Sequence, residues 1–94
     1  AAVAAAALDA GAAIVNDVSG FRLDAAMGAT CARARAGVIL MHSRGTVADM
    51  ATYAHAEYGD VVEEVRAELG AARDGAVAAG IAPEAIVLDP GIGF

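Results

Sequence analysis

Apolar residues form three short runs along the chain, and each run ends in polar residues followed by glycine. Runs this short, bounded by glycine or proline, predict buried strands rather than helices. The strands are predicted over residues 12–18, over residues 38–42 and from Ala85 or Ile86 onward. The three runs read Ile14-Val15-Asn16-Asp17-Val18-Ser19-Gly20, Val38-Ile39-Leu40-Met41-His42-Ser43-Arg44-Gly45 and Ile86-Val87-Leu88-Asp89-Pro90-Gly91-Ile92-Gly93-Phe94.

Three segments between and before these runs have helical character. Residues 1–10 are mostly alanine, and Gly11 is placed to end a helix there. Asp24 is a suitable N-cap for a second helix, which we expect to run through residue 36 and to end at Gly37. A third, amphipathic helix is expected from Asp60 to Gly80. Its apolar stripe comprises Val61, Val62, Val65, Leu69, Ala72, Ala76 and Val77.

The resulting order is α-β-α-β-α-β, and no long linker interrupts it. Alternating helices and near-continuous apolar strands predict an α/β fold with parallel strands covered by helices. We therefore treat residues 1–94 as a single structural unit. Two architectures use such units, the open doubly wound sheet and the eight-stranded barrel. In both of them, functional residues collect at the carboxyl ends of the strands.

Charge and cysteine content restrict the function classes. The 94 residues carry a formal net charge of -6, with six arginines and no lysine, which disfavours a nucleic acid or an anionic membrane as partner. The single cysteine, Cys31, cannot form an internal disulfide, so a cytoplasmic location is favoured. Cys31 is expected to pack as a small residue of a helix. No apolar run approaches the roughly 20 residues of a membrane span, and the start in mid-helix without a methionine suggests a piece of a longer protein.

Strand alternation suggests a binding pocket at the carboxyl ends. It places Asn16 on one face with Val18, and it orients Met41 and Asp89 like Ile39 and Val87. If these faces converge, the pocket suits a flat polar heterocycle, because the Asp89 carboxylate can accept two parallel hydrogen bonds and the apolar groups can cover the ring. The alternatives are that Asn16-Asp17 forms a strand-ending turn and that Asp89 initiates a turn before Pro90.

Other polar residues have simpler interpretations. His42 could be a general base, but its neighbours offer no obvious nucleophile, so a hydrogen-bonded structural role is favoured. His42 and His55 lack further metal ligands at usable spacing. The acidic residues Glu63, Glu64 and Glu68 are most simply a solvated helix surface. The segment 43–59 is longer than an ordinary βα loop, and loops of that length are often functional.

Taken together, these motifs resemble dihydropteroate synthase. The residues that carry the resemblance are Asn16-Asp17-Val18-Ser19-Gly20, Leu40-Met41-His42-Ser43-Arg44-Gly45, Tyr58-Gly59-Asp60-Val61-Val62-Glu63-Glu64-Val65 and Asp89-Pro90-Gly91-Ile92-Gly93-Phe94. The resemblance covers essentially all 94 residues. It implies that the chain is the central part of a (β/α)₈ TIM barrel, from helix 3 to strand 6. It also implies a transferase of folate biosynthesis, which condenses 6-hydroxymethyl-7,8-dihydropterin pyrophosphate with 4-aminobenzoate and releases pyrophosphate.

The resemblance also assigns residues to the pterin. By motif, Asn16 and Asp89 would hold the polar edge of the pterin, while Val18, Met41 and Phe94 would line its ring. It implies a magnesium ion whose ligand lies outside this chain, together with outlying Lys and Arg residues for pyrophosphate and aminobenzoate. No catalytic residue and no metal ligand are therefore assigned here, and this chain alone is expected to be inactive. The full-length protein is expected to be a homodimer.

Two other functions remain open at this stage. A methyltetrahydrofolate-dependent methyltransferase shares the pterin-binding barrel, and a non-catalytic pterin-binding paralogue would share the pocket. The run Leu40-Met41-His42 followed by Arg44-Gly45 favours the synthase over the methyltransferase. Only sequence outside these 94 residues could distinguish the paralogue from the synthase.

Overall fold

The computed structural model describes residues 1–46 and 58–94. Most of the predicted long loop, including His55, lies outside the described residues. The elements are α1 (Ala2–Asp9), β1 (Ile14–Asp17), α2 (Met27–Arg33), β2 (Gly37–Met41), α3 (Val61–Ala78), a 3₁₀ turn η1 (Pro83–Ala85) and β3 (Ile86–Asp89). This confirms the predicted order α-β-α-β-α-β.

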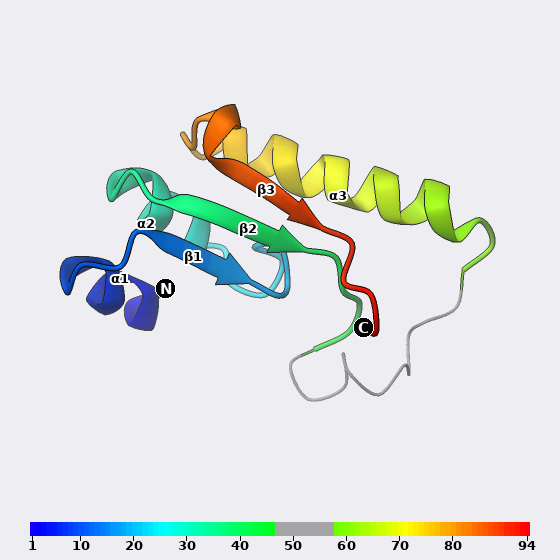
Figure 1. Ribbon diagram of the computed structural model, residues 1–94, viewed down its shortest axis with the longest axis horizontal. Coiled ribbons are helices and arrows are strands. Elements are labelled where there is room, and N and C mark those ends of the chain that lie inside the picture. The colour runs from blue at the N-terminus through cyan, green and yellow to red at the C-terminus, as the bar shows by residue number, and fades with distance from the viewer. Residues whose placement is uncertain (47–57) are drawn as a thin grey trace.

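The three strands form one parallel sheet in the order β1-β2-β3, and their arrowheads all point the same way in Figure 1. Parallel pairing follows from the helices that connect successive strands, since a crossover returns the chain to the same end of the sheet. Asn16 is paired with Ile39, and Met41 is paired with Asp89. The carboxyl ends of all three strands therefore lie at one edge, as the sequence predicted.

One face of the sheet is covered by the helices. Val38 and Leu40 of the central strand are fully buried on this face, in a cluster with Cys31, Ala76 and Ile81. Burial raises the pKa of the Cys31 thiol, which suits an inert core residue and confirms the predicted packing. The core of the molecule thus lies between the sheet and the helices.

The opposite face of the sheet is largely open, although Met41 at its carboxyl end is only 7% exposed. Alternation and register give this face to Ile14, Asn16, Ile39, Met41, Val87 and Asp89. Ile14 is 61% exposed and Val87 is 58% exposed, although both are apolar strand residues. An apolar face without a covering layer is what the inner surface of part of a barrel would present.

The helix ends follow the predicted capping rules in most places. The Asp60 side chain accepts a hydrogen bond from the Glu63 N–H at 3.1 Å and begins α3. Gly80, at φ +105°, ends the same helix, and the Ile81 N–H then donates to the Ala76 carbonyl as in a Schellman motif. Gly11, at φ +112°, ends α1 in the same way. No helix in residues 1–46 and 58–94 is long and apolar enough to cross a membrane.

The second helix is shorter than predicted, and Gly37 does not end it. Asp24 accepts a hydrogen bond from the Ala26 N–H at 2.9 Å, which forms a turn and delays the helix to Met27. At the other end Arg35 adopts φ +54°, and the Ala36 N–H donates to the Cys31 carbonyl. An arginine therefore occupies the left-handed position that usually favours glycine. Gly37 is instead the first residue of β2.

The apolar stripe of α3 is only partly buried. Ala76 is fully buried in the core, whereas Val61 is 52% exposed and Val62 is 74% exposed. The first turns of α3 instead line a hollow of about 590 Å³ together with Leu88 and residues 90–94. The predicted apolar stripe is therefore present, but of its residues only Ala76 is fully buried.

We expect the isolated 94-residue chain to aggregate or to be loosely ordered. Among the described residues, β1 and β3 each pair only with β2, so two sheet edges are unpaired, and the open face exposes Ile14 and Val87. Unpaired edges and exposed apolar patches promote association between chains. Size-exclusion chromatography and thermal unfolding of the isolated chain test this expectation. A monomer that unfolds in one cooperative transition would contradict it.

Candidate functional site

The open face carries polar side chains at the carboxyl edge of the sheet. Met41 of β2 is paired with Asp89 of β3, and Asn16 of β1 is paired with Ile39, two residues before Met41. Paired residues of neighbouring strands present their side chains to the same face. Asn16 and Asp89 thus lie on either side of the central strand, with the apolar Ile39 and Met41 between them. The structure brings together the three strand residues that the sequence analysis assigned to the pocket.

Asp89 has one oxygen engaged in the local turn and one that is not. Its Oδ1 accepts a hydrogen bond from the Gly91 N–H at 2.8 Å, as a turn-forming aspartate does. Among the described residues, nothing donates to its Oδ2. A carboxylate offers about four acceptor positions. Turn formation and ligand binding, which the sequence analysis treated as alternatives for Asp89, are therefore compatible.

Asn16 and Asp17 have different roles. Asp17 points to the helix side, where its Oδ1 accepts from the Ser19 N–H and the Ser19 hydroxyl, both at 2.7 Å. Its Oδ2 accepts from the Phe21 N–H at 3.2 Å. Asn16 is exposed on the open face, and its side chain makes no hydrogen bond within residues 1–46 and 58–94. The turn interpretation thus holds for Asp17, and Asn16 is available to a ligand.

The two remaining predicted pocket residues lie outside the strands. Val18 follows β1 and is 38% exposed. Phe94 lies beyond β3 and lines the hollow of about 590 Å³ beside α3, which it shares with Val62 and Leu88. The strand register does not bring Phe94 to Asn16 and Met41.

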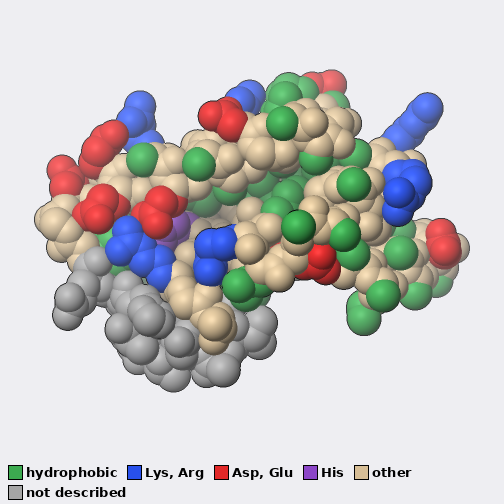
Figure 2. All heavy atoms as spheres, turned by 180° about the vertical axis from the view of Figure 1, so that it is seen from behind, with side chains coloured by type: hydrophobic (Ala, Val, Ile, Leu, Met, Phe, Trp, Pro, Cys, Tyr) green, Lys and Arg blue, Asp and Glu red, His purple; other side chains and the backbone are tan. Residues whose placement is uncertain are grey.

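The loop that follows β2 is tied to α3 by a cluster of charged side chains. His42 is 7% exposed, and its Nε2 lies 3.3 Å from Glu68 Oε2. Arg44 donates to both oxygens of Glu68, from Nη2 at 2.7 Å and from Nε at 3.2 Å. Its guanidinium also lies over the Tyr58 ring, 4.0 Å from the ring centroid. Figure 2, from the helix side, shows basic and acidic side chains side by side next to a histidine.

This cluster corrects one interpretation and confirms another. Glu68 binds His42 and Arg44, and Glu64 Oε1 lies 3.5 Å from Arg44 Nη2, so these two residues are not a merely solvated surface. His42 has the hydrogen-bonded environment that was favoured for it. Sequence reasoning missed Glu68 because its partners lie more than 20 residues away. The signal was an arginine three residues after a strand and two glutamates at helical spacing.

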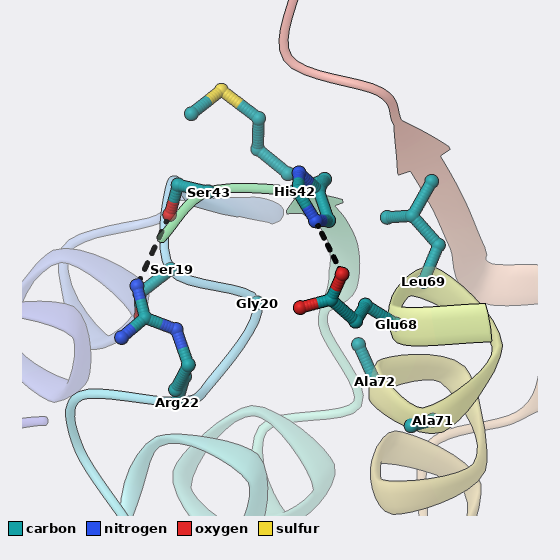
Figure 3. A pocket seen from close by; sticks show the side chains of 10 residues that line it. Ser19, Gly20, Arg22, His42, Ser43, Glu68, Leu69, Ala71 and Ala72 are labelled. Carbon is teal, nitrogen blue, oxygen red and sulfur yellow. Dashed lines mark hydrogen bonds and ion pairs between the residues drawn. The ribbon is translucent and has the colours of Figure 1, made fainter. Parts of the chain in front are cut away.

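A second contact joins the loop after β1 to the loop after β2. Arg22 donates to the Gly45 carbonyl at 2.7 Å and to the Ser43 hydroxyl at 3.3 Å, and that hydroxyl donates to the Val18 carbonyl at 2.6 Å. Arg22 and Ser43 line a hollow of about 330 Å³ together with Glu68. In Figure 3, Arg22 and Glu68 lie on opposite sides of it, with Ser43 and His42 above them. Met41 is the last residue of β2 and directly precedes the loop after that strand. These contacts therefore fix the carboxyl edge of the sheet, where the site lies.

Comparison with known proteins identifies the family. A protein-family model described as "Pterin binding enzyme" matches residues 1–94. The chain belongs to this family of pterin binding enzymes. A dihydropteroate synthase of Mycobacterium leprae is 53% identical over 92 residues, which are 98% of this chain and 32% of that protein. The resemblance inferred from the motifs is therefore confirmed along the chain.

Solved structures of pterin binding enzymes have the same fold. Dihydropteroate synthase from Thermus thermophilus in complex with 6HMPPP matches with a TM-score of 0.85 at 44% identity, over 99% of this chain and 36% of that one. The Thermus thermophilus enzyme in complex with 4-aminobenzoate matches with a TM-score of 0.87 at 45% identity, over 99% of this chain and 35% of that one. The three-stranded sheet thus matches part of a TIM barrel, and the chain spans about a third of the length of these relatives.

Proposed function

We propose that this chain forms part of the pterin pocket of a dihydropteroate synthase. The observation that carries the proposal is the shared face of Asn16, Met41 and Asp89, an amide and a carboxylate on either side of an apolar strand. Relatives that match nearly the whole chain are dihydropteroate synthases, including one solved in complex with 6HMPPP. The same relatives give no support to the methyltransferase alternative.

In this proposal each residue has a role in orienting the pterin. Asp89 accepts hydrogen bonds from the ring N–H and the exocyclic amine, Asn16 meets the remaining polar edge, and Met41 covers the ring. Val18 would add to the apolar lining. An oriented pterin presents its methylene carbon to the amine of 4-aminobenzoate. The new C–N bond forms as the C–O bond to pyrophosphate breaks, and the amine loses a proton.

Other parts of the reaction are assigned to residues outside this chain. We propose, as the resemblance implies, that a magnesium ion is held by a ligand outside this chain. Within residues 1–46 and 58–94, no group of three or more His, Cys, Asp or Glu residues could hold a metal ion. No step is therefore assigned to a metal on these residues. A homodimer and a cytoplasmic location, inferred from the resemblance and from the lone Cys31, remain proposals for the full-length protein.

The proposal predicts a condensation activity that depends on Asn16. The full-length protein should convert the pterin pyrophosphate and 4-aminobenzoate into dihydropteroate and pyrophosphate, with no methyl transfer from methyltetrahydrofolate. Asn16→Ala should weaken pterin binding by roughly 5-fold to 150-fold, because it removes hydrogen bonds and leaves a ligand group unpaired. Calorimetry with a pterin analogue measures this effect.

Asp9→Ala serves as the control for this experiment. Asp9 is exposed at the end of α1, and its replacement should leave pterin affinity unchanged. Pterin binding without condensation would indicate the non-catalytic paralogue, and methyl transfer would indicate the methyltransferase. Equal affinity of the Asn16→Ala variant and the parent would remove Asn16 from the pocket.

A further inference from the structure

Glu68 is the point at which α3 holds the loop after β2. Its two carboxylate oxygens meet two side chains of that loop, with Oε2 at 3.3 Å from His42 Nε2 and at 2.7 Å from Arg44 Nη2, and with Oε1 at 3.2 Å from Arg44 Nε. The hydrogen bond from Arg44 is the main cause that lowers the pKa of Glu68. Glu68 is therefore ionised near neutral pH, and its fork-like contact with Arg44 fixes both partners in one geometry.

The position of Arg44 is defined by more than Glu68. Its guanidinium stacks over the Tyr58 ring at 4.0 Å and also reaches Glu64. Tyr58 precedes α3 and Glu64 lies in the first turns of that helix. The start of α3 and the loop after β2 are thus joined by several contacts, and Glu68 is the member that also reaches the buried His42.

His42 transmits this contact to the proposed pterin site. It directly follows Met41, whose side chain lies on the open face, and its backbone N–H donates to the Asp89 carbonyl at 2.8 Å. Gly91 packs closely against the His42 carbonyl on the same side. The backbone of His42 is therefore held by β3, while its side chain is held by α3 through Glu68. Figure 3 shows Glu68 pointing from the helix to the His42 ring.

We propose that Glu68 is a positioning residue for the pterin site, which fixes Met41 and Asp89 relative to each other through His42. The inference rests on the proposed function of this site. Glu68 itself does not touch the pterin, because it lies on the helix side of the sheet. Without the Glu68 carboxylate, the buried His42 ring and the Arg44 guanidinium each lose a hydrogen-bond acceptor. The His42 backbone, which joins Met41 to Asp89, is then no longer fixed from the side of α3. Small displacements at a binding site weaken hydrogen bonds that need a defined geometry.

Glu68→Gln in the full-length protein tests this role. Glutamine keeps the size of the side chain but replaces one acceptor oxygen with an NH₂ group, which cannot accept from His42 or Arg44. The variant should bind a pterin analogue roughly 5-fold to 30-fold more weakly than the parent. Calorimetry at a temperature at which both proteins are fully folded gives the affinity, and the stoichiometry reports the competent fraction.

Glu63→Gln is the matched control. Glu63 lies on the same helix, but it pairs with the exposed Arg66 at 3.0 Å and makes no hydrogen bond or ion pair with residues 42–46, the described part of the loop after β2. It should change the affinity by less than about threefold. If Glu68→Gln behaves like Glu63→Gln while Asp89→Asn still weakens binding, the positioning role is wrong and the proposed function stands. If the parent itself does not bind the analogue, the proposed function and this inference both fall.

A double-mutant cycle separates positioning from a general loss of stability. If Glu68 acts by placing Asp89, its replacement should matter little once Asp89 has lost its acceptor. The combined Glu68→Gln and Asp89→Asn variant should then bind the analogue within about threefold of Asp89→Asn alone. Independent effects that multiply in the double variant would overturn the inference, because a destabilised but correctly placed site would give that result.

Discussion

Gly91→Ala is expected to destabilise the full-length protein by about 3 kcal/mol or more, which lowers Tm by roughly 6 °C or more. A Cβ atom on Gly91 would lie 2.3 Å from the His42 carbonyl oxygen and 3.2 Å from Met41 Cγ. The first of these neighbours is backbone held by the sheet, so it cannot move aside as a flexible side chain could. Gly91 also has φ +69°, a conformation that L side chains adopt at a cost of about 1–2 kcal/mol. Thermal and denaturant unfolding measure the loss.

Gly93→Ala separates the two causes. Gly93 also has a positive φ, +96°, but no atom of residues 1–46 and 58–94 lies within 4 Å of its added Cβ atom. This variant should lose only the stability that a positive φ costs an L residue, on the order of 1–2 kcal/mol. Equal losses for the two variants would mean that the close approach of Gly91 to His42 contributes nothing to stability. The Cβ atom added at Gly91 should also displace His42 and the neighbouring Met41 relative to Asp89. Gly91→Ala should therefore bind the pterin more weakly than Gly93→Ala.

The strands and the faces of the sheet were predictable because they depend on local patterns. A short apolar run bounded by glycine indicates a strand, and the period of two then assigns Asn16 and Asp89 to a face. What alternation cannot give is the register between strands, which decides that Met41 lies beside Asp89 and Asn16 beside Ile39. The sequence suggested that the faces converge, and the pairing shows which residues meet.

The boundaries of α2 and the charged cluster could not be predicted in the same way. Arg35 takes a left-handed conformation in place of the expected Gly37, because the loop must turn directly into β2. Glu68 reaches Arg44 across a separation of 24 residues. Such contacts are set by how α3 packs on the sheet, and a helical pattern shows only that Glu68 borders the apolar stripe. A charged residue beside that stripe can face either solvent or a neighbouring loop.

Asp89→Asn is expected to have the largest effect on ligand affinity among the side chains of the site. The substitution keeps the shape, and the amide oxygen can still accept from the Gly91 N–H, so the local turn should survive. The second oxygen becomes an NH₂ group, which would face a pterin N–H. Losing a charge-assisted hydrogen bond and leaving a buried donor unpaired should cost on the order of 2 to 4 kcal/mol, or roughly 30-fold to 1000-fold in affinity.

Calorimetric titration of the full-length variant with a pterin analogue measures this loss, and Asp74→Asn supplies the matched control. Asp74 is an exposed residue of α3 whose replacement changes the net charge equally, so its variant should bind like the parent. Equal unfolding midpoints of the two variants would show that the effect of Asp89 is confined to the ligand. If Asp89→Asn binds the analogue within about threefold of the parent, Asp89 serves only the turn, because about 0.7 kcal/mol is too little for a charge-assisted bond.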